Sequence, residues 1–190
     1  MSDSRLTDVI ERPVPTGSRL TEKELDWCLR FQQTVHQRGI VRLFAVVSRL
    51  GDGIFWYALM AALLRSEGWA AAPAVGKMLL VGAMCLGLYK WLKARTTRPR
   101  PCAQHARIQP RVAPLDEYSF PSGHTLHAVA FTLIAVHGYP PLAWLLLPFA
   151  LLVALSRVVL GLHYPSDVLA GALLGASLAL LALHAPFIQL

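Results

Sequence analysis

Residues 141–184 read PLAWLLLPFALLVALSRVVLGLHYPSDVLAGALLGASLALLALH and carry the strongest structural signal in the chain. They contain two long apolar segments, residues 141–160 and 166–184, separated by a short polar connection. A helix needs roughly 17–25 apolar residues to cross the hydrocarbon core of a bilayer. Both segments are of about that length, so this stretch predicts two antiparallel transmembrane helices.

Three more apolar segments precede this pair, at residues 52–64, 71–91 and 122–136. We therefore expect an all-α fold: a membrane helical bundle of about five transmembrane helices, or six if residues 30–64 contain another span. In the last span, Gly171 and Gly175 form a GxxxG motif. Such a motif allows close approach of two helices and would permit a homodimer.

The composition also favours a membrane protein. Of the 190 residues, 55% are hydrophobic and 15% charged, and the mean hydropathy is +0.46, whereas about a quarter of residues are charged in soluble domains. The net charge is +7, but the cations border apolar spans, which favours anionic lipid and phosphate over nucleic acid as partners. The three cysteines form no CxxC pair, so neither a disulfide framework nor a zinc site is indicated.

The N-terminal part differs from the apolar remainder. Residues 1–20 are polar and predict a disordered tail without a cleavable signal peptide. Residues 21–50 place apolar side chains at helical spacing among several arginines, which predicts an amphipathic interfacial segment of one or two helices. Thr21 and Glu24 fit a capping box at its start. Residues 51–190 are then the transmembrane domain.

Three polar blocks interrupt the apolar sequence, at residues 93–101 (KARTTRPRP), 121–124 (PSGH) and 156–167 (SRVVLGLHYPSD). Antiparallel spans bring the end of the second, the start of the third, the end of the fourth and the start of the fifth to one membrane face. All three blocks therefore converge. Charge is costly in a membrane protein, so a cluster of this kind predicts a functional site.

The third block contains a histidine and a carboxylate four residues apart. On a helix, His163 and Asp167 would share one face. A carboxylate beside one ring nitrogen holds the tautomer in which the other nitrogen is free to attack. The structural alternative is a helix-capping aspartate beside an interfacial histidine.

The PSGH block can bind an anion at the start of a helix. Ser122 offers a hydroxyl, Gly123 lets the backbone approach a ligand, and helix N-terminal amides point the same way. His124 adds a proton donor. A capped turn without function is the alternative, and His127, one turn further on, is expected to be a packed or interfacial histidine.

Lys93, Arg100 and Arg157 are interpreted as a phosphate clamp, since guanidinium groups grip phosphate oxygens in pairs. The alternative is a patch for lipid head groups, to which Arg95 and Arg98 are assigned. Asp116 is interpreted as an ordinary loop residue. No metal and no cofactor are expected, because adjacent cations would oppose a second positive centre.

Taken together, the blocks match the pattern K-x6-R-P, P-S-G-H and S-R-x5-H-x3-D. This ordered triple resembles the type 2 phosphatidic acid phosphatase family of integral membrane lipid phosphatases, over about residues 50–185. The resemblance implies an all-helical bundle, which that family shares with vanadium-dependent haloperoxidases, and metal-independent catalysis.

The resemblance also implies roles. His163 would be the nucleophile that forms a phosphohistidine, with Asp167 as its orienting partner, and His124 would protonate the leaving oxygen and then activate water. The implied phosphate-binding shell consists of Lys93, Arg100, Ser122, Gly123 and Arg157.

The expected function is hydrolysis of a lipid phosphate: phosphatidic acid, phosphatidylglycerol phosphate, or a polyprenyl phosphate or diphosphate. Two alternatives stay open. A lipid phosphotransferase would use the same phosphohistidine with an alcohol acceptor, and a non-catalytic protein would only bind anionic lipid. We expect a bacterial inner (plasma) membrane location. With five spans, the site shares a face with the arginine-rich residues 21–50, which the positive-inside rule places in the cytoplasm.

Overall fold

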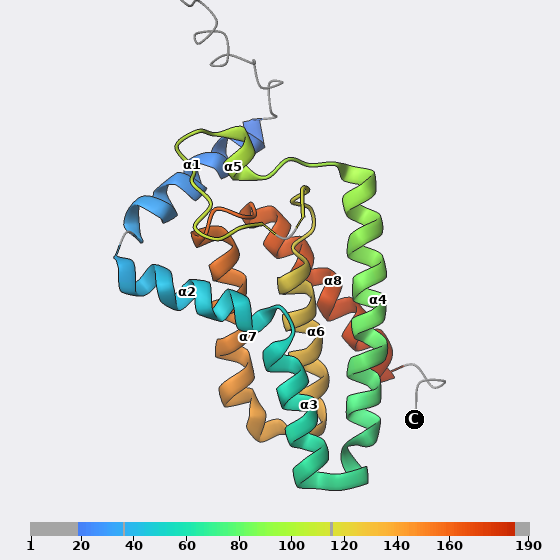
Figure 1. The fold of residues 1–190 in the computed structure, drawn as a ribbon. Helices are drawn as coiled ribbons and strands as arrows, with labels where there is room; N and C mark the ends of the chain where they lie inside the picture. Colours follow the sequence, from blue (N-terminus) through green and yellow to red (C-terminus); the bar gives the residue numbers. More distant parts are fainter. Residues whose placement is uncertain (1–18, 36, 115, 185–190) are drawn as a thin grey trace, which may run out of the picture.

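The structure, a computed structural model, describes residues 19–35, 37–114 and 116–184, and these residues are built from helices joined by loops (Figure 1). Over that part of the chain there is no strand, and the only bridge pairs Pro99 with Tyr118. The predicted all-α class is therefore confirmed. The helices are α1 Arg19–Thr34, α2 Arg38–Gly51, α3 Ile54–Glu67, α4 Ala72–Thr96, α5 Pro101–Gln104, α6 Gly123–Gly138, α7 Ala143–Val159 and α8 Pro165–His184, with 3₁₀ turns at Gly68–Ala71 and Pro140–Leu142.

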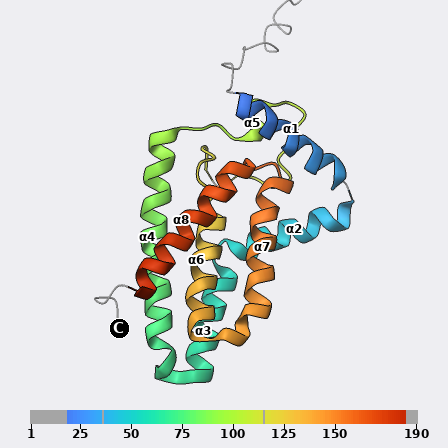
Figure 2. The same cartoon turned by 180° about the vertical axis from the view of Figure 1, so that it is seen from behind.

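Three stretches of the described chain are long and apolar enough to cross a membrane: Ile54–Thr96, Pro140–Val159 and Pro165–His184. The first contains both α3 and α4, which form a hairpin that turns at Gly68–Ala71 (Figures 1 and 2). These stretches make the chain an integral membrane protein. The count of five or six crossings stays a prediction, because α6 has only 16 residues.

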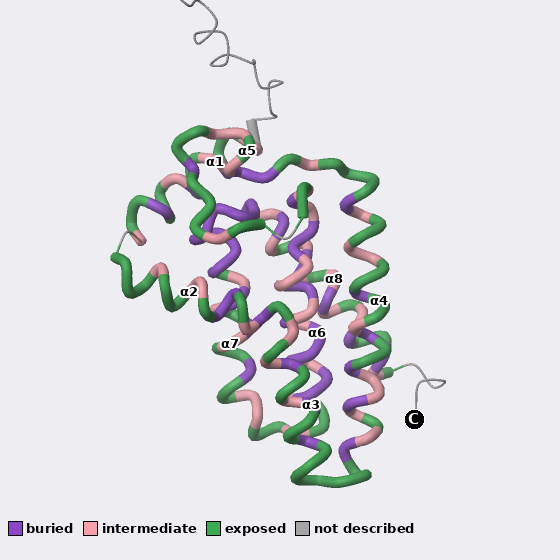
Figure 3. Tube along the Cα trace, in the orientation of Figure 1, coloured by how far each residue is buried: buried purple, intermediate pink, exposed green. Residues whose placement is uncertain are grey.

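The outward faces of the long helices are apolar, as a lipid-facing surface requires, and Figure 3 shows them as exposed. On α4 and α8, for example, Leu79, Met84, Leu173 and Leu181 are all exposed. The side chains that face inward pack around α6, which contacts α4, α7 and α8. The helix that carries the PSGH block therefore forms the centre of the bundle.

The GxxxG motif of α8 is used inside the chain. A Cβ atom added to Gly171 would lie 2.5 Å from the carbonyl oxygen of Ser122, and one added to Gly175 would meet the carbonyl oxygen of Leu126. Both glycines therefore let α8 pack against the backbone of α6. The expected homodimer stays a prediction, but it loses this motif as its support.

The N-terminal part contains two helices, within the one or two that the sequence predicts for this segment. α1 ends at Thr34 and α2 begins at Arg38, and their exposed side chains include Trp27, Phe31 and Leu43. α1 already includes Arg19, so Thr21 lies within the helix and the predicted capping box is wrong. The interfacial position of these helices stays a prediction, and the predicted tail lies almost entirely outside the described residues.

The long loop between α4 and α6 and the turn between α7 and α8 form a layer at one end of the bundle, together with α1 and α5, whereas the turns from α3 to α4 and from α6 to α7 lie at the other end (Figure 1). Backbone hydrogen bonds hold the long loop between α4 and α6 in place: Ser119 N donates to Arg98 O at 2.8 Å, and Arg111 N donates to Leu160 O at 3.2 Å. The loop therefore packs onto the turn between α7 and α8, where the third polar block lies.

Candidate active site

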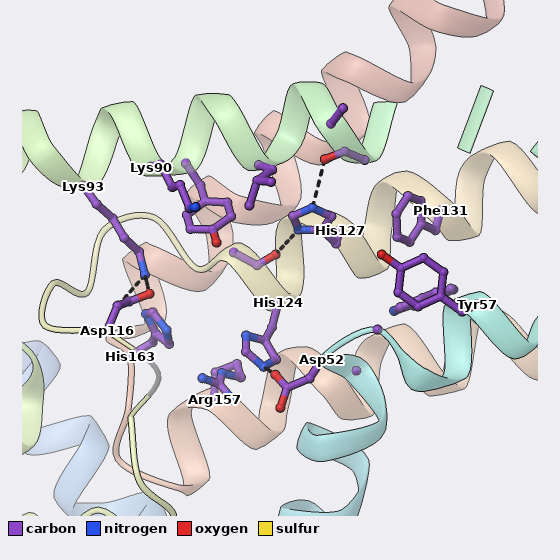
Figure 4. Close-up of a pocket in the computed structure, with 18 of the residues that line it drawn as sticks. Asp52, Tyr57, Lys90, Lys93, Asp116, His124, His127, Phe131, Arg157 and His163 are labelled. Carbon is purple, nitrogen blue, oxygen red and sulfur yellow. Dashed lines mark hydrogen bonds and ion pairs between the residues drawn. The ribbon is translucent and has the colours of Figure 1, made fainter. Parts of the chain in front are cut away.

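The three polar blocks meet at this end of the bundle, around a cavity of about 750 Å³ (Figure 4). The cavity also receives residues from α2, α3 and the long loop. The predicted site residues that line it are Lys93, Arg100, Gly123, His124, Arg157 and His163. The expected convergence of the blocks is thus what the structure shows.

His163 lies in the turn between α7 and α8, and its ring is 1% exposed. Its Nε2 atom is 3.3 Å from Nη1 of Arg100, and its Nδ1 atom is 3.6 Å from Oδ2 of Asp167. Because a guanidinium can only donate, this contact fits a ring whose Nε2 is unprotonated and whose Nδ1–H faces Asp167. In that tautomer, the free lone pair of His163 lies on Nε2, beside Arg100 of the predicted phosphate clamp.

Burial, followed by the positive charges of Arg157, Arg100 and Lys93, holds the pKa of His163 well below its ordinary value. The ring is therefore neutral at neutral pH, which is the form that can attack phosphorus. The 3.6 Å separation from Asp167 exceeds hydrogen-bond length, and Nδ1 has no hydrogen-bond partner among the described residues. Catalytic hydrogen bonds commonly shorten when substrate binds.

Asp167 is fully buried near the start of α8. Its Oδ2 atom accepts a hydrogen bond from Tyr164 N at 2.9 Å, and its Oδ1 atom is 2.6 Å from Nη1 of Arg98. Asp167 therefore caps the turn into α8, as a structural role requires, and also faces His163, as a catalytic role requires.

Arg98 was assigned to a lipid-head-group patch, and that assignment is wrong. Its side chain is 22% exposed and binds two carboxylates, those of Asp167 and Glu24. The guanidinium also lies 4.0 Å from the ring centroid of Tyr164. Burial alone would lower the pKa of Arg98, but the two carboxylates outweigh it and raise that pKa. One feature of the sequence could have indicated this role for Arg98: Glu24 and Asp167 are acidic, and a buried carboxylate needs a cation as its partner.

Two of the clamp residues, Lys93 and Arg100, meet on the carboxylate of Asp116, so the interpretation of Asp116 as an ordinary loop residue is wrong. Lys93 Nζ lies 2.7 and 2.6 Å from the two carboxylate oxygens of Asp116, and Arg100 Nη2 lies 2.6 Å from Oδ1. Burial alone would raise the pKa of Asp116, but Lys93 and Arg100 outweigh it and lower that pKa. An ionised carboxylate therefore occupies the position where the clamp would hold an anion.

Arg157 approaches the cavity from the end of α7 and is 3% exposed. Its Nη1 atom donates to the Ser48 hydroxyl on α2. Its Nε–H has no hydrogen-bond partner among the described residues. A buried guanidinium with a spare donor is suited to a phosphate oxygen.

In the PSGH block, the Ser122 hydroxyl lies 3.0 Å from the Thr125 hydroxyl, and its backbone N–H donates to Asp167 O at 3.0 Å. Ser122 thus ties the start of α6 to α8 and does not line the cavity, whereas Gly123 does. His127 packs between α4 and α6, with Nδ1 at 2.8 Å from Gly123 O and Nε2 at 3.2 Å from Gly82 O, and it also lines the cavity.

His124 points into the cavity, and its Nε2 atom contacts the carboxylate of Asp52, which follows α2 (Figure 4). Burial alone would raise the pKa of Asp52, but the hydrogen bond from His124 and nearby positive charges outweigh it and lower that pKa. Sequence reasoning treated Asp52 only as the edge of a span. An acid at the start of an apolar span was the signal that could have found it.

Beyond the polar residues, the cavity continues between α3 and α4 with an apolar lining. The residues of this apolar arm are Trp56, Tyr57, Met60, Met78, Leu79, Leu86 and Phe131. Across the residues that the structure describes, no group of three or more His, Cys, Asp or Glu side chains could hold a metal ion.

The fold and the site define a class: an integral membrane helical protein with two histidines, each near a carboxylate, in a cation-lined cavity. The family model for the PAP2 superfamily matches residues 74–189, so the chain belongs to this superfamily. The resemblance drawn from the three motifs is thereby confirmed. Helices α1 to α3 precede the matched region.

Two solved structures share the fold. The transmembrane PAP2 type phosphatidylglycerolphosphate phosphatase from Bacillus subtilis has a TM-score of 0.64 and 26% identity, covering 86% of this chain and 85% of that one. LpxE from Aquifex aeolicus has a TM-score of 0.69 and 24% identity, covering 84% of this chain and 93% of that one. The second likeness concerns the fold alone.

A relative by sequence is the decaprenylphosphoryl-5-phosphoribose phosphatase of Mycolicibacterium smegmatis. It is 36% identical over 120 residues, which cover 56% of this chain and 63% of the relative. The chain therefore spans less than two thirds of the length of this relative.

Proposed function

We propose that the protein is a membrane phosphatase that hydrolyses phosphate monoesters or diphosphates of lipids, without a metal ion, through a phosphohistidine. One observation carries this proposal. The Nε2 atom of His163 lies 3.3 Å from Arg100 in a cavity that is also lined by Lys93, Arg157 and His124. A neutral nucleophile, a cationic clamp and a second histidine are thus gathered in one place.

In the first step, His163 Nε2 would attack phosphorus. A P–N bond forms while the P–O bond to the lipid breaks, and His124 gives its proton to the departing oxygen. Asp167 would stabilise the positive charge that develops on the His163 ring. Lys93, Arg100 and Arg157 would neutralise the phosphoryl oxygens, which is the largest demand of this reaction.

In the second step, His124 would take a proton from water, and the water oxygen would attack phosphorus. The P–N bond breaks, inorganic phosphate leaves, and both histidines return to their starting states. In this scheme the backbone of Gly123 and the start of α6 would also face the phosphate, and Ser122 would hold that helix start through its bond to Asp167.

The substrate class follows from the apolar arm of the cavity and from the relatives. An acyl or prenyl chain would lie along the apolar arm between α3 and α4, while the phosphate meets the clamp. The named relatives act on a polyprenyl-linked phosphate and on phosphatidylglycerolphosphate. We therefore propose phosphatidic acid, phosphatidylglycerol phosphate and polyprenyl phosphates or diphosphates as candidates.

We also propose a location in the bacterial plasma membrane with the site on the cytoplasmic face. The supporting observation is that α1 packs at the same end of the bundle as the site. The positive-inside rule places the N-terminal segment in the cytoplasm because of its arginines, which are Arg30, Arg38, Arg42 and Arg49.

The experiment is phosphate release from this lipid panel by detergent-purified protein in excess chelator, beside a His163→Ala variant. Release that survives chelation and disappears in the variant supports the proposal and ranks the substrates. Loss on chelation, or undiminished release by the variant, would refute histidine catalysis without metal. Lipid binding with no release, also in the presence of alcohol acceptors, would favour a non-catalytic lipid-binding protein, and transfer to an alcohol would favour a phosphotransferase.

A further inference from the structure

We propose that Glu24 on α1 is a positioning residue of the active site, acting through Arg98 on Asp167 and so on His163. This inference rests on the proposed function and extends it to a helix outside the region that the family model matches, residues 74–189. The four side chains form a continuous series of contacts from α1 to the proposed nucleophile.

Glu24 is 3% exposed although it belongs to a helix with many exposed residues. Its Oε2 atom is 2.7 Å from Nη2 of Arg98, and its Oε1 atom accepts a hydrogen bond from the backbone N–H of Ser166 at 2.9 Å. Ser166 is the residue before Asp167 at the start of α8. One carboxylate therefore holds both the arginine and the helix start that carry the orienting acid.

Arg98 uses the two ends of its guanidinium fork for two carboxylates. Nη2 contacts Glu24, whereas Nη1 is 2.6 Å from Asp167 Oδ1 and donates to the Ser166 hydroxyl at 2.8 Å. The Tyr164 ring lies beneath the guanidinium. Because the fork is planar and rigid, fixing one end fixes the other. Glu24 thus determines where Arg98 holds the Asp167 carboxylate.

Asp167 needs this support because its own position sets that of His163. Its Oδ2 atom faces Nδ1 of His163 at 3.6 Å, and a shift of the carboxylate would change the ring orientation and the stabilisation of the imidazolium. Removing the Glu24 charge would leave Arg98 with a single anionic partner and free to move toward solvent.

Further contacts from the same face of α1 support the assignment. Cys28, four residues after Glu24, lies with Sγ 3.9 Å from the carbonyl oxygen of His163. Gln32, another four residues on, donates from Nε2 to Gln109 O at 2.9 Å. Gly161 has φ 73°, and a Cβ atom there would lie 2.5 Å from Gln32 Nε2. α1 therefore packs tightly against the turn that carries His163.

The test compares Glu24→Gln with Glu22→Gln, which removes an exposed carboxylate from the same helix. The activity of each variant is measured on two substrates. One is a lipid phosphate in detergent micelles, and the other is p-nitrophenyl phosphate, a soluble substrate that needs no membrane docking. We expect kcat of Glu24→Gln to fall about 10-fold on both substrates with little change in KM, as for other residues that orient a functional side chain. Glu22→Gln should match the unchanged protein.

Arg98→Lys provides a second, independent variant, because an ammonium group cannot hold both carboxylates as the fork does. It should lower kcat similarly, and Glu24→Gln combined with it should cost little more than either change alone, since both act through one contact series. If Glu24→Gln does not fold, as judged by thermal unfolding in detergent, Glu24→Asp, which keeps the charge on a shorter side chain, replaces it in the same comparison.

Unchanged kcat in folded Glu24→Gln would overturn the inference, as would a change confined to KM for the lipid, which would indicate membrane docking. Full additivity of the two changes would also overturn it. The His163→Ala variant separates the two proposals. If it is inactive while Glu24→Gln is unaffected, only the positioning role fails, whereas activity in His163→Ala removes the proposed function.

Discussion

Asp116 Oδ1 lies 2.6 Å from Nη2 of Arg100 and 2.7 Å from Nζ of Lys93, so one carboxylate bridges two of the three clamp cations. Its side chain is 39% exposed, which leaves it room to move away. A substrate phosphate that uses the same cations has to displace this carboxylate. Asp116 is therefore expected to compete with phosphate for the clamp.

Replacing Asp116 with asparagine tests this competition. The variant should bind phosphate more tightly, with a product inhibition constant lowered about 10-fold, which corresponds to about 1.4 kcal/mol. Inhibition of lipid hydrolysis by inorganic phosphate measures it, with Glu22→Gln as the control. Weaker inhibition by phosphate would show instead that Asp116 holds Lys93 and Arg100 in their binding positions.

The contact between the Asp52 carboxylate and His124 Nε2 predicts that Asp52 has a role in leaving-group protonation. Asp52→Asn should lower kcat for an alkyl phosphate about 10-fold or more, because without the carboxylate His124 is less well positioned and carries the proton it must deliver less often. The loss should be much smaller for p-nitrophenyl phosphate, whose leaving group departs without a proton. Asp26→Asn, an exposed carboxylate on α1, is the matched control. Equal losses on both substrates would contradict this role.

The lowered pKa of His163 predicts the acidic side of the pH profile. Rate requires the unprotonated ring, so kcat/KM should fall only when pH drops through a value below about 6.5, the ordinary value for histidine. Because His124 must be protonated, the rate should also fall at higher pH, giving a bell shape. An acidic limb at or above the ordinary histidine pKa would contradict the burial argument.

The same shift links pH to stability. His163 binds a proton more weakly in the folded state than in the unfolded state, so the folded protein is favoured above about pH 6.5 and loses that contribution as pH falls. Thermal unfolding in detergent between pH 7.5 and 5 measures this slope, and His163→Asn should make it shallower.

The membrane orientation can be tested at Cys102, which is partly exposed in α5 beside the site, whereas Cys28 and Cys85 are buried. With the two buried cysteines replaced, a membrane-impermeant thiol reagent should label Cys102 only after cell lysis if the site is cytoplasmic. A cysteine placed at exposed Trp69, in the turn between α3 and α4, gives a control at the other end of the bundle. Labelling of Cys102 in intact cells would place the site outside.

The long apolar segments could be predicted closely because each signal is local. Residues 141–160 and 166–184 correspond to α7 Ala143–Val159 and α8 Pro165–His184, and residues 122–136 correspond to α6 Gly123–Gly138. The predicted second span was too short, since α4 continues to Thr96 and carries Lys93 within the helix. The sequence left open whether residues 21–50 form one helix or two, because both halves share one pattern of apolar residues and arginines, and the structure shows two helices.

The convergence of the three polar blocks likewise followed from the chain alone. Antiparallel spans of similar length leave the blocks on one face whatever the details of packing, which depends only on helix geometry and membrane thickness. The contact of His163 with Asp167 has another origin than the expected helical spacing, because His163 lies in the turn before α8 and only Asp167 belongs to that helix.

The partners of the site residues depended on long-range packing. Arg98 and Arg95 look alike in sequence, yet only Arg98 is reached by Glu24, 74 residues away, and by Asp167, 69 residues away. Asp52 and Asp116 could not be assigned for the same reason. A buried charge is stable only beside its counter-charge, and which charges meet is settled when α1, α2 and the long loop fold over the end of the bundle.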